Sequence, residues 1–477
     1  MAVPAAPGIE RPMRSRWFAL AVLCGGLLMI ILDGTIVSTA LPTIQSDLGF
    51  SPEGLAWTVN AYLVPLGGLL LLAGRLGDLL GRRRMLVAGL SLFVVASLLC
   101  GLAVGPEMLV AARFVQGVAA AMASAVVLGM IVELFPEPAE RGRAMGAYAF
   151  VGAAGASIGT LLGGVLTDAV GWPWIFFVNV PIGIVVVVLA LRTLPADGPR
   201  TGSGHADVLG GVLVTAGLAA LVFTIIAPSG PLVRVIAGVV AGTLLVAFVL
   251  RQRRPSRPRT APGAGAEPLV DLRVFRSRAV SGGNVAQLLV VAAMMGFQFT
   301  VALYLQHSLG YTPTQAGLAL LPVPVVIAVV SLTAAGRLIT RFGARAVLVV
   351  GESVLVVGLA LLTVTVGGDY AVSILPAMVL LGLGAGVVIP AVNTVIMSDA
   401  TPQNAGLASG LANTSQQVGA AIGIAVLAAL AAARTDGLVT GGVPTAAALA
   451  SGYQLAFAIS AVLAALATVV TLVVLRR

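Results

Sequence analysis

Residues 74–89 read GRLGDLLGRRRMLVAG, and residues 336–351 read GRLITRFGARAVLVVG. The two stretches agree at eight of their sixteen positions and lie 262 residues apart. Each stands between two long apolar runs, and self-similarity at a fixed spacing indicates that a structural unit occurs twice in the chain. The repeat therefore predicts two related halves whose helices are joined by short basic loops.

The apolar runs around the repeat have the length of membrane-spanning helices. The 477 residues are 59% hydrophobic and only 9% charged, whereas soluble proteins carry about 25% charged residues. A helix crosses the bilayer core with about 20 apolar residues. Fourteen runs meet that length: 17–41, 54–73, 85–104, 108–131, 144–168, 174–193, 207–227, 232–250, 279–305, 314–336, 346–366, 372–397, 405–431 and 452–475.

These runs predict an all-α membrane protein with 14 transmembrane helices. The repeat assigns the first six and the last six spans to two pseudo-symmetric six-helix bundles, with two helices inserted between them. The expected domains are an N-terminal bundle at 1–200, the inserted helices with a basic cytoplasmic linker at 201–278, and a C-terminal bundle at 279–477. Two related halves around a central path are typical of secondary transporters.

The arginines predict the orientation of the chain. All 27 basic residues are arginine; with a cytoplasmic N-terminus, 24 lie in cytoplasmic segments, two lie outside and Arg113 lies within a span. This asymmetry follows the positive-inside rule, so we expect cytoplasmic N- and C-termini. It explains the net charge of +9 without nucleic acid as a partner. Arginines of the linker 251–278 are suited to anionic lipid headgroups, although a solvated positive-inside linker is the favoured explanation.

The segment LLMIILDGTIVSTALP (27–42) places a carboxylate, Asp33, inside the first span. It lies roughly 24 Å along that helix, at a depth similar to that of Arg113 in the fourth, antiparallel span. Each charge alone costs about 2.5–3.5 kcal/mol in the membrane. Burial favours the protonated carboxyl and a nearby arginine favours the carboxylate, so a changing distance would change proton affinity. We predict that Asp33 and Arg113 couple transport to protons; the alternative is a static structural ion pair.

Five motifs together resemble the major facilitator superfamily, in its fourteen-helix drug:proton antiporter branch. They are GRLGDLLGRRRM (74–85), RFVQGVAAAMASA (113–125), LDGTIVSTALPTI (32–44), WPWIFFVNVPIG (172–183) and GLASGLANTSQQVGAAIG (406–423). They stand in the family's order and span essentially the whole chain. One departure concerns the fifth span, where Thr160 stands at the position of the proline in the family's antiporter motif.

The resemblance implies that the loop motif forms a cytoplasmic latch between the halves. Asp78 would hold the start of the thirteenth span, since an acid favours a helix N-terminus, and Glu133 is placed to meet an arginine of the motif. A solvated positive-inside loop is the alternative for the arginines. The predicted gating residues are Gly74, Asp78, Gly81, Arg82, Arg83 and Glu133; the second copy has Thr340 in place of Asp78.

Two further groups of residues belong to the predicted transport path. Small residues at four-residue spacing allow close helix packing, and in the fifth span these are Gly155, Gly159, Gly163 and Gly164. Uncharged polar residues within spans are candidates for the wall of a substrate cavity, or for hydrogen bonds between helices: Asn60, Tyr62, Gln116, Gln287, Gln298, Asn393, Asn413 and Gln417. Glu352 is expected near the cytoplasmic end of its span, which leaves Asp33 as the one deep acid.

These features predict a proton-coupled efflux antiporter for multiple amphipathic drugs, working by alternating access in a bacterial cytoplasmic (inner) membrane. The sequence has no phosphate-binding GxxxxGK[ST] motif, so a gradient would supply the energy. We expect no enzymatic activity, no cofactor beyond the proton, no metal and a monomeric state. A dedicated exporter of one lipid or metabolite remains an alternative, and so does a non-transporting scaffold or sensor, which the loop motif and Asp33 disfavour.

Overall fold

The computed structural model describes residues 13–52, 54–197, 206–226, 230–253, 268–365, 370–399 and 405–475. Within these ranges it contains fourteen helical segments that are long and apolar enough to cross a membrane. The predicted fold class is thereby confirmed. The predicted boundary at residue 200 falls in the segment 198–205, outside the described residues, and the division into three domains stays a prediction.

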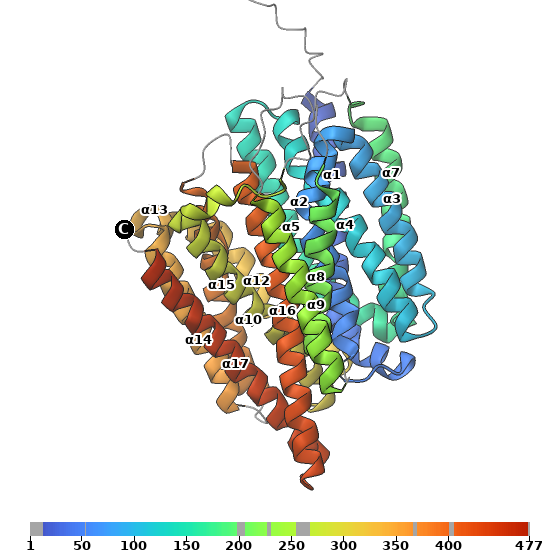
Figure 1. The fold of residues 1–477 in the computed structure, drawn as a ribbon, viewed down its shortest axis with the longest axis vertical. Helices are drawn as coiled ribbons and strands as arrows, with labels where there is room; N and C mark the ends of the chain where they lie inside the picture. The colour runs from blue at the N-terminus through green and yellow to red at the C-terminus, as the bar shows by residue number, and fades with distance from the viewer. Residues whose placement is uncertain are drawn as a thin grey trace, which may run out of the picture.

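The helices of the first half pack around α4 and α1 (Figure 1). α4 contacts both α2 and α3, whereas α1 contacts α5 and α7. The elements are α1 (Met13–Leu48), the 3-10 turn η1 (Gly54–Ala56), α2 (Trp57–Leu80), α3 (Arg82–Gly101), α4 (Pro106–Leu134), α5 (Pro138–Val170), α6 (Trp174–Phe177) and α7 (Asn179–Thr193).

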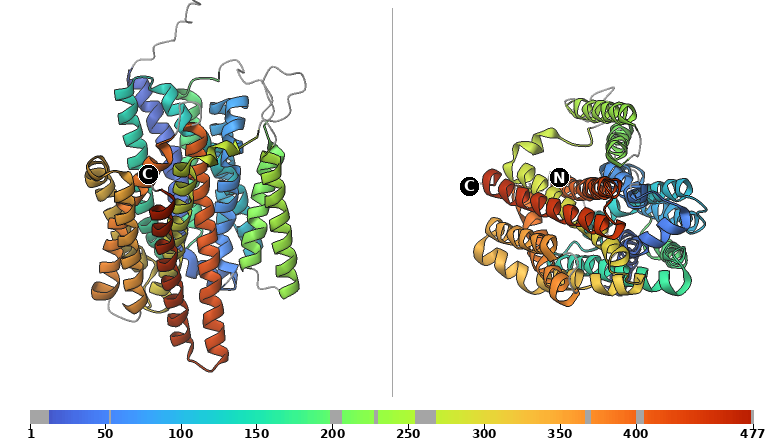
Figure 2. Two further views of the ribbon diagram at one scale, coloured as in Figure 1. Left: turned by 60° about the vertical axis from the view of Figure 1, so that its left-hand side comes forward. Right: turned by 90° about the horizontal axis from the view of Figure 1, so that it is seen from below.

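The two inserted helices, α8 (Val208–Ile226) and α9 (Pro231–Gln252), form a hairpin at the periphery of the bundle (Figure 2). α8 packs against α2 of the first half and α16 of the second half. Exposed apolar side chains cover much of α9, as expected of a helix that faces lipid: Leu232, Val233, Val235, Ile236, Val239 and Val240.

The second half extends from η2 (Leu272–Arg276) to the end of the described chain. Its elements are α10 (Arg278–His307), α11 (Pro313–Leu320), α12 (Pro322–Val330), the π-helical η3 (Ser331–Ala335), α13 (Gly336–Phe342), α14 (Ala344–Thr365), the π-helical η4 (Tyr370–Ile374), α15 (Leu375–Met397), α16 (Ala405–Thr440) and α17 (Thr445–Val474). α16 and α17 project beyond the other helices at one end (Figures 1 and 2).

Several predicted spans differ from the observed helices in their bounds or their continuity, and two of these differences have a clear physical reason. The span expected at 314–336 is divided into α11, α12, η3 and α13. The break between α11 and α12 falls at Pro322, which has no amide hydrogen to continue the α-helical ladder. The span expected at 405–431 continues to Thr440. The length of an apolar run indicates how many residues cross the membrane, whereas the helix itself can continue beyond it.

The two ends of the bundle differ in how the halves meet. We call the end that carries Arg16, Arg82 and the start of α5 the arginine-rich end, and the other the arginine-poor end. At the arginine-poor end, the side-chain nitrogen of Gln306 donates to the carbonyl oxygen of Thr39 over 3.1 Å. The amide of Thr314 donates to the carboxylate of Asp168 over 2.8 Å. These bonds join α10 and α11 to α1 and α5, so the halves are closed against each other there.

Candidate functional site

Asp33 and Arg113 form a buried ion pair between α1 and α4. Both side chains are 0% exposed, and Nη1 of Arg113 donates to Oδ2 of Asp33. Because neither charge reaches solvent, each is compensated mainly by the other. The contact that helix direction and depth predict is present; its role in proton coupling stays a prediction.

The second oxygen of Asp33 is held by two amides. Gln116 donates to Oδ1 over 2.8 Å, and Asn179 at the start of α7 donates to the same atom over 2.9 Å. Gln116 also accepts from Arg113 over 2.7 Å and donates to Ser97 over 2.8 Å. All the groups around the carboxyl are donors, and this arrangement stabilises Asp33 as an anion.

The guanidinium of Arg113 lies over the ring of Tyr62. Its Cζ is 4.4 Å from the centroid of that ring and 5.7 Å from the centroid of Phe176. Nε of Arg113 donates to the carbonyl oxygen of Thr58 over 3.0 Å. The Tyr62 hydroxyl donates to the carbonyl oxygen of Ile30 over 3.1 Å. These contacts hold the arginine in one orientation, with cation–π attraction added to the ion pair.

Three predicted cavity residues belong to the interior of the first half instead. Gln116 and Asn60 are 0% exposed and Tyr62 is 2% exposed, so none of them lines an open wall in this arrangement. Gln116 and Tyr62 serve the Asp33–Arg113 pair. For Gln116 and Tyr62 the alternative of hydrogen bonds between helices is present in this arrangement, whereas the side-chain amide of Asn60 is buried without a hydrogen-bond partner among the described residues. A role of these residues in a substrate cavity stays a prediction.

The other predicted cavity residues lie on α10, α15 and α16. Gln287 is buried on α10, whereas Asn393 on α15 is exposed and its amide donates to the carbonyl of Ile389 on the same helix. Gln298, Asn413 and Gln417 are partly buried. Their place in a substrate path stays a prediction.

The loop motif forms an exposed ion-pair cluster within the first half. Arg82 at the start of α3 pairs with Asp78 at 2.9 Å and with Glu133 at 2.8 Å. The Asp78 and Glu133 side chains are 50% and 66% exposed. The contact of Glu133 with a motif arginine is present, while the predicted partner of Asp78 at the start of the thirteenth span adjoins residues 400–404, outside the described residues. Gating stays a prediction.

A carboxylate that the sequence analysis missed, Asp197, caps α3. Its two oxygens accept from the amides of Arg83 and Arg84 over 2.9 and 3.0 Å. Gly81 precedes these amides with φ of 109°, and a Cβ there would lie 2.3 Å from the Asp197 carboxyl carbon. Glycine is therefore needed at this position for both its backbone angle and the approach of Asp197. The guanidinium of Arg83 also donates to the carbonyl of Leu191, so Arg83 acts within the first half as well.

Three of the four α5 glycines face α1. A Cβ at Gly155 would lie 3.0 Å from Leu28, one at Gly159 would lie 2.9 Å from the Leu32 carbonyl oxygen, and one at Gly163 would lie 2.2 Å from that of Ile36. The predicted close-approach surface is thus a contact between α5 and α1. Gly74 is different, since a Cβ there would have its nearest neighbour at an ordinary 4.0 Å.

Gly164 and Thr160 face the other half of the protein. A Cβ at Gly164 would lie 2.4 Å from the carbonyl oxygen of Pro313, and one at Gly317 would lie 2.9 Å from that of Thr160. The Thr160 hydroxyl donates to Ala156 over 3.0 Å and α5 continues unbroken. α5 is therefore a continuous helix through Thr160 at the α5–α11 contact.

We expect Gly164→Val to separate α5 from α11 at the arginine-poor end, because the backbone of Pro313 cannot yield to the added side chain. Spin labels at the exposed positions Val165 and Leu318, in a background without cysteines, should report a longer distance by double electron–electron resonance. Gly146→Val is the matched control, since a Cβ there meets nothing within 4 Å. An unchanged distance distribution would contradict the expectation.

The second half contains a buried acid whose burial was not predicted from the sequence. Glu352 on α14 is 0% exposed, and Thr471 of α17 donates to its Oε1 over 3.0 Å. The sequence places Glu352 near the start of its span, and the helix begins at Ala344, so Glu352 lies roughly 12 Å along it. Packing by α17 removes the side chain from solvent.

Another missed carboxylate, Asp207, joins the two inserted helices. It pairs with Arg251 at 2.5 Å and accepts from Gln252 and the amide of Gly210, each over 2.9 Å. Gln252 in turn accepts from Val270 over 3.1 Å. Asp207 thus ties the start of α8 to the end of α9; the rest of the linker, at 254–267, lies outside the described residues, as does its predicted lipid contact.

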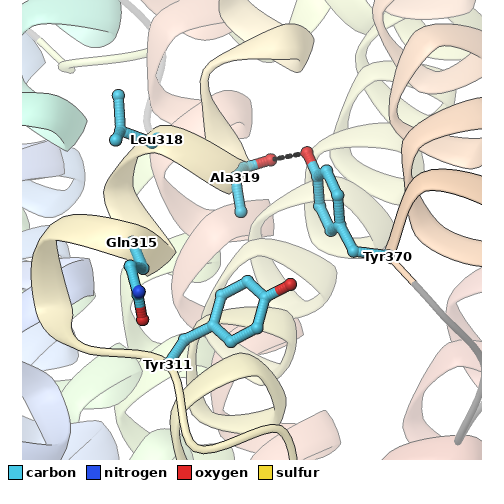
Figure 3. A pocket seen from close by; sticks show the side chains of 5 residues that line it. All are labelled: Tyr311, Gln315, Leu318, Ala319 and Tyr370. Atoms are coloured by element: carbon cyan, nitrogen blue, oxygen red, sulfur yellow. Dashed lines mark hydrogen bonds between the residues drawn. The ribbon is translucent and has the colours of Figure 1, made fainter.

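A pocket of about 410 Å³ lies in the second half, lined by Tyr311, Gln315, Leu318, Ala319 and Tyr370 (Figure 3). The Tyr370 hydroxyl donates to the carbonyl oxygen of Ala319 over 2.7 Å. The predicted cavity residues do not line this pocket, so it is distinct from the central path expected from the sequence.

Comparison with known proteins places these features in a family. The model of the Major Facilitator Superfamily matches residues 23–208 and 206–424. The puromycin resistance protein pur8 of Streptomyces alboniger is 39% identical over 428 residues, which are 88% of this chain and 82% of that protein. The probable actinorhodin transporter of Streptomyces coelicolor is 36% identical, over 88% of this chain and 73% of that protein.

Two further comparisons agree. The multidrug resistance protein Stp of Mycobacterium tuberculosis is 33% identical over 86% of this chain and 74% of that protein. The crystal structure of an auto-inhibited POT family peptide transporter superposes with a TM-score of 0.69 and 16% identity, covering 97% of each chain. Matches across both halves, together with fourteen spanning helices, show that this chain belongs to the major facilitator superfamily, a family of membrane transporters and not of enzymes.

Proposed function

We propose that this protein exports amphipathic small molecules in exchange for protons, by alternating access across a bacterial cytoplasmic membrane. The arginine-rich end would be cytoplasmic, with both termini on that side. The names of the relatives support export, because they describe resistance to puromycin, multidrug resistance and transport of actinorhodin.

The observation that carries the proposal is the buried Asp33–Arg113 pair. A proton that binds Asp33 neutralises the partner of Arg113 and weakens the bond between α1 and α4. α1 also touches α10 of the second half, through the bond between Thr39 and Gln306. A change at Asp33 can therefore reach the contact that closes the arginine-poor end, and such a link between ion binding and closure is what coupling requires.

The arrangement of the halves supports an inward-facing step of the cycle. The arginine-poor end is joined by two hydrogen bonds between the halves, whereas the cluster of Asp78, Arg82 and Glu133 at the arginine-rich end is exposed and bonded within the first half. A compound would enter from the cytoplasm in this state and leave after the arginine-poor end opens.

A dedicated exporter of one compound is the second candidate. It is favoured by a relative whose name gives a single compound, actinorhodin. The two candidates differ in selectivity and share the proton chemistry. The choice between a multidrug exporter and a dedicated exporter therefore depends on substrate selectivity, and not on the proton stoichiometry or on the oligomeric state.

The experiment is a transport panel with purified protein in lipid vesicles under an imposed pH gradient. Cationic, neutral and anionic amphipathic compounds are tested in parallel, and proton release on binding is followed in detergent. We expect uptake into vesicles with an acidic lumen for several compounds. Movement of a single compound would favour the dedicated exporter, and movement that is independent of the pH gradient would contradict antiport.

A further inference from the structure

Glu352 is buried at the contact between α14 and α17, on the opposite half from Asp33. Its Oε1 accepts from the Thr471 hydroxyl over 3.0 Å, and its Oε2 is buried with no hydrogen-bond partner among the described residues. One oxygen of the carboxyl is therefore satisfied as an acceptor, while the other is in position to carry a proton.

The helices around Glu352 supply no compensating charge. α14 packs against α15 and α17, and the sequences of these two helices contain no Asp, Glu, Arg or His. Tyr453 on α17 contacts His307 near the other end of the helix. Among the described residues, no arginine lies within 4 Å of the Glu352 carboxyl, since the ion pairs of the structure do not include it.

The arginines of α13 and α14 that lie near Glu352 in the sequence do not pair with its carboxyl. Arg345, two turns before Glu352 on α14, donates to the carbonyl oxygen of Leu472 over 3.0 Å. Arg337 and Arg341 belong to α13, and the guanidinium of Arg341 lies over the ring of Phe342. Tyr370 of η4 donates to Ala319. Nε of Arg345 is buried without a hydrogen-bond partner, but none of the ion pairs among the described residues includes Glu352. Thr471 is the one hydrogen-bond partner of the Glu352 carboxyl among the described residues.

An unpaired carboxylate in such a place is far more costly to bury than a neutral carboxylic acid. We propose that Glu352 is a second proton-binding site, which holds its proton in the arrangement of helices described here. The site itself does not depend on proton-coupled export, whereas its use in transport rests on the proposed function.

The two carboxyls would then hold opposite protonation states in one conformation. Asp33 is surrounded by donors and paired with Arg113, which suits an anion. Glu352 has a single hydroxyl donor and no cation, which suits the acid. Loss of the proton from Glu352 would require water or a cation to enter between α14 and α17, so proton release is tied to loosening of this contact.

Infrared spectroscopy tests this proposal directly. The C=O stretching band of a protonated carboxylic acid is recorded for the full-length protein in lipid vesicles at neutral pH, in H₂O and D₂O. We expect Glu352→Gln to remove a component of this band. Thr471→Val should shift the same component to higher frequency, because the hydroxyl no longer donates to the C=O oxygen. Ser353→Ala, at an exposed neighbour on α14, should leave it unchanged.

The possible outcomes separate the explanations. A wild-type spectrum without the component, or a component that survives Glu352→Gln, would overturn the proposal and indicate an ion pair with Arg345 or with the arginines that follow α17. If Glu352→Gln does not fold, the Thr471→Val spectrum alone tests the proposal: a shift of the band to higher frequency supports a protonated Glu352, and an unchanged band contradicts it. The measurement needs no transport, so a failure of proton-driven export leaves its result intact, and Asp33→Asn should not alter the Glu352 component.

Discussion

Asp33→Asn is expected to reduce transport driven by a pH gradient to the leak of protein-free vesicles, with the protein still inserted and folded. Asparagine has nearly the same shape as aspartate but cannot bind and release a proton. The amides of Gln116 and Asn179 retain an acceptor at this position, whereas Arg113 is left buried without its counter-ion, which costs stability; thermal unfolding in detergent is therefore measured beside transport. Uptake of a substrate into vesicles with an acidic lumen measures the effect, and binding in detergent checks that the substrate site is retained.

Asp47→Asn is the control for this variant. It lies on the same helix, near the arginine-poor end, where its carboxylate accepts from the indole of Trp172 over 3.1 Å. Because Asp47 lies outside the buried pair, we expect normal gradient-driven transport. Transport by Asp33→Asn that still follows the pH gradient would show that another group carries the proton.

Arg113→Leu is expected to lower the free energy of unfolding by about 3–5 kcal/mol, because the variant leaves Asp33 buried without its counter-ion. The double variant Asp33→Asn/Arg113→Leu removes both charges and should be more stable than Arg113→Leu alone. Thermal unfolding in detergent measures both effects. The loss in Arg113→Leu should be smaller in acid, since a protonated carboxyl is less costly to bury than an unpaired carboxylate.

The control for the arginine is Arg434→Leu, which removes an exposed guanidinium that donates to Ser451 over 3.3 Å. We expect a change within about 0.5 kcal/mol, as for other surface substitutions. If the double variant were no more stable than Arg113→Leu, the loss would come from the packing of Arg113 on Tyr62 and not from an unpaired carboxylate.

The buried pair could be predicted because helix direction and depth are enough to place two charges. The spans fix which way α1 and α4 run, and a charge in a span needs a partner at the same depth. Asn179 could not be predicted in the same way, since a neutral side chain at the start of a helix has many possible partners. Gln116 carried a usable signal, because it lies one turn after Arg113 and so on the same face of α4.

The three acids were missed for different reasons. The burial of Glu352 could not be predicted, because it depends on tertiary packing by α17. Asp197 lies in a connecting segment, and its bonds to Arg83 and Arg84 join residues more than 110 positions apart. Asp207 had a local signal in the sequence. It stands directly before an apolar helix, and an aspartate at that position is typical of a helix start.

The position of the inserted hairpin makes the two flanks of the transporter unequal. α8 lies close to α2, since a Cβ at Gly68 would meet the Thr215 backbone at 3.0 Å, and it also touches α16 across the boundary between the halves. A rocking motion that widens the α2–α16 boundary must therefore break contacts of a third helix. Among the described residues, neither α8 nor α9 packs against the boundary between α5 and α11. We therefore expect the two halves to pivot at the α2–α16 boundary, where α8 lies, and to separate at the α5–α11 boundary.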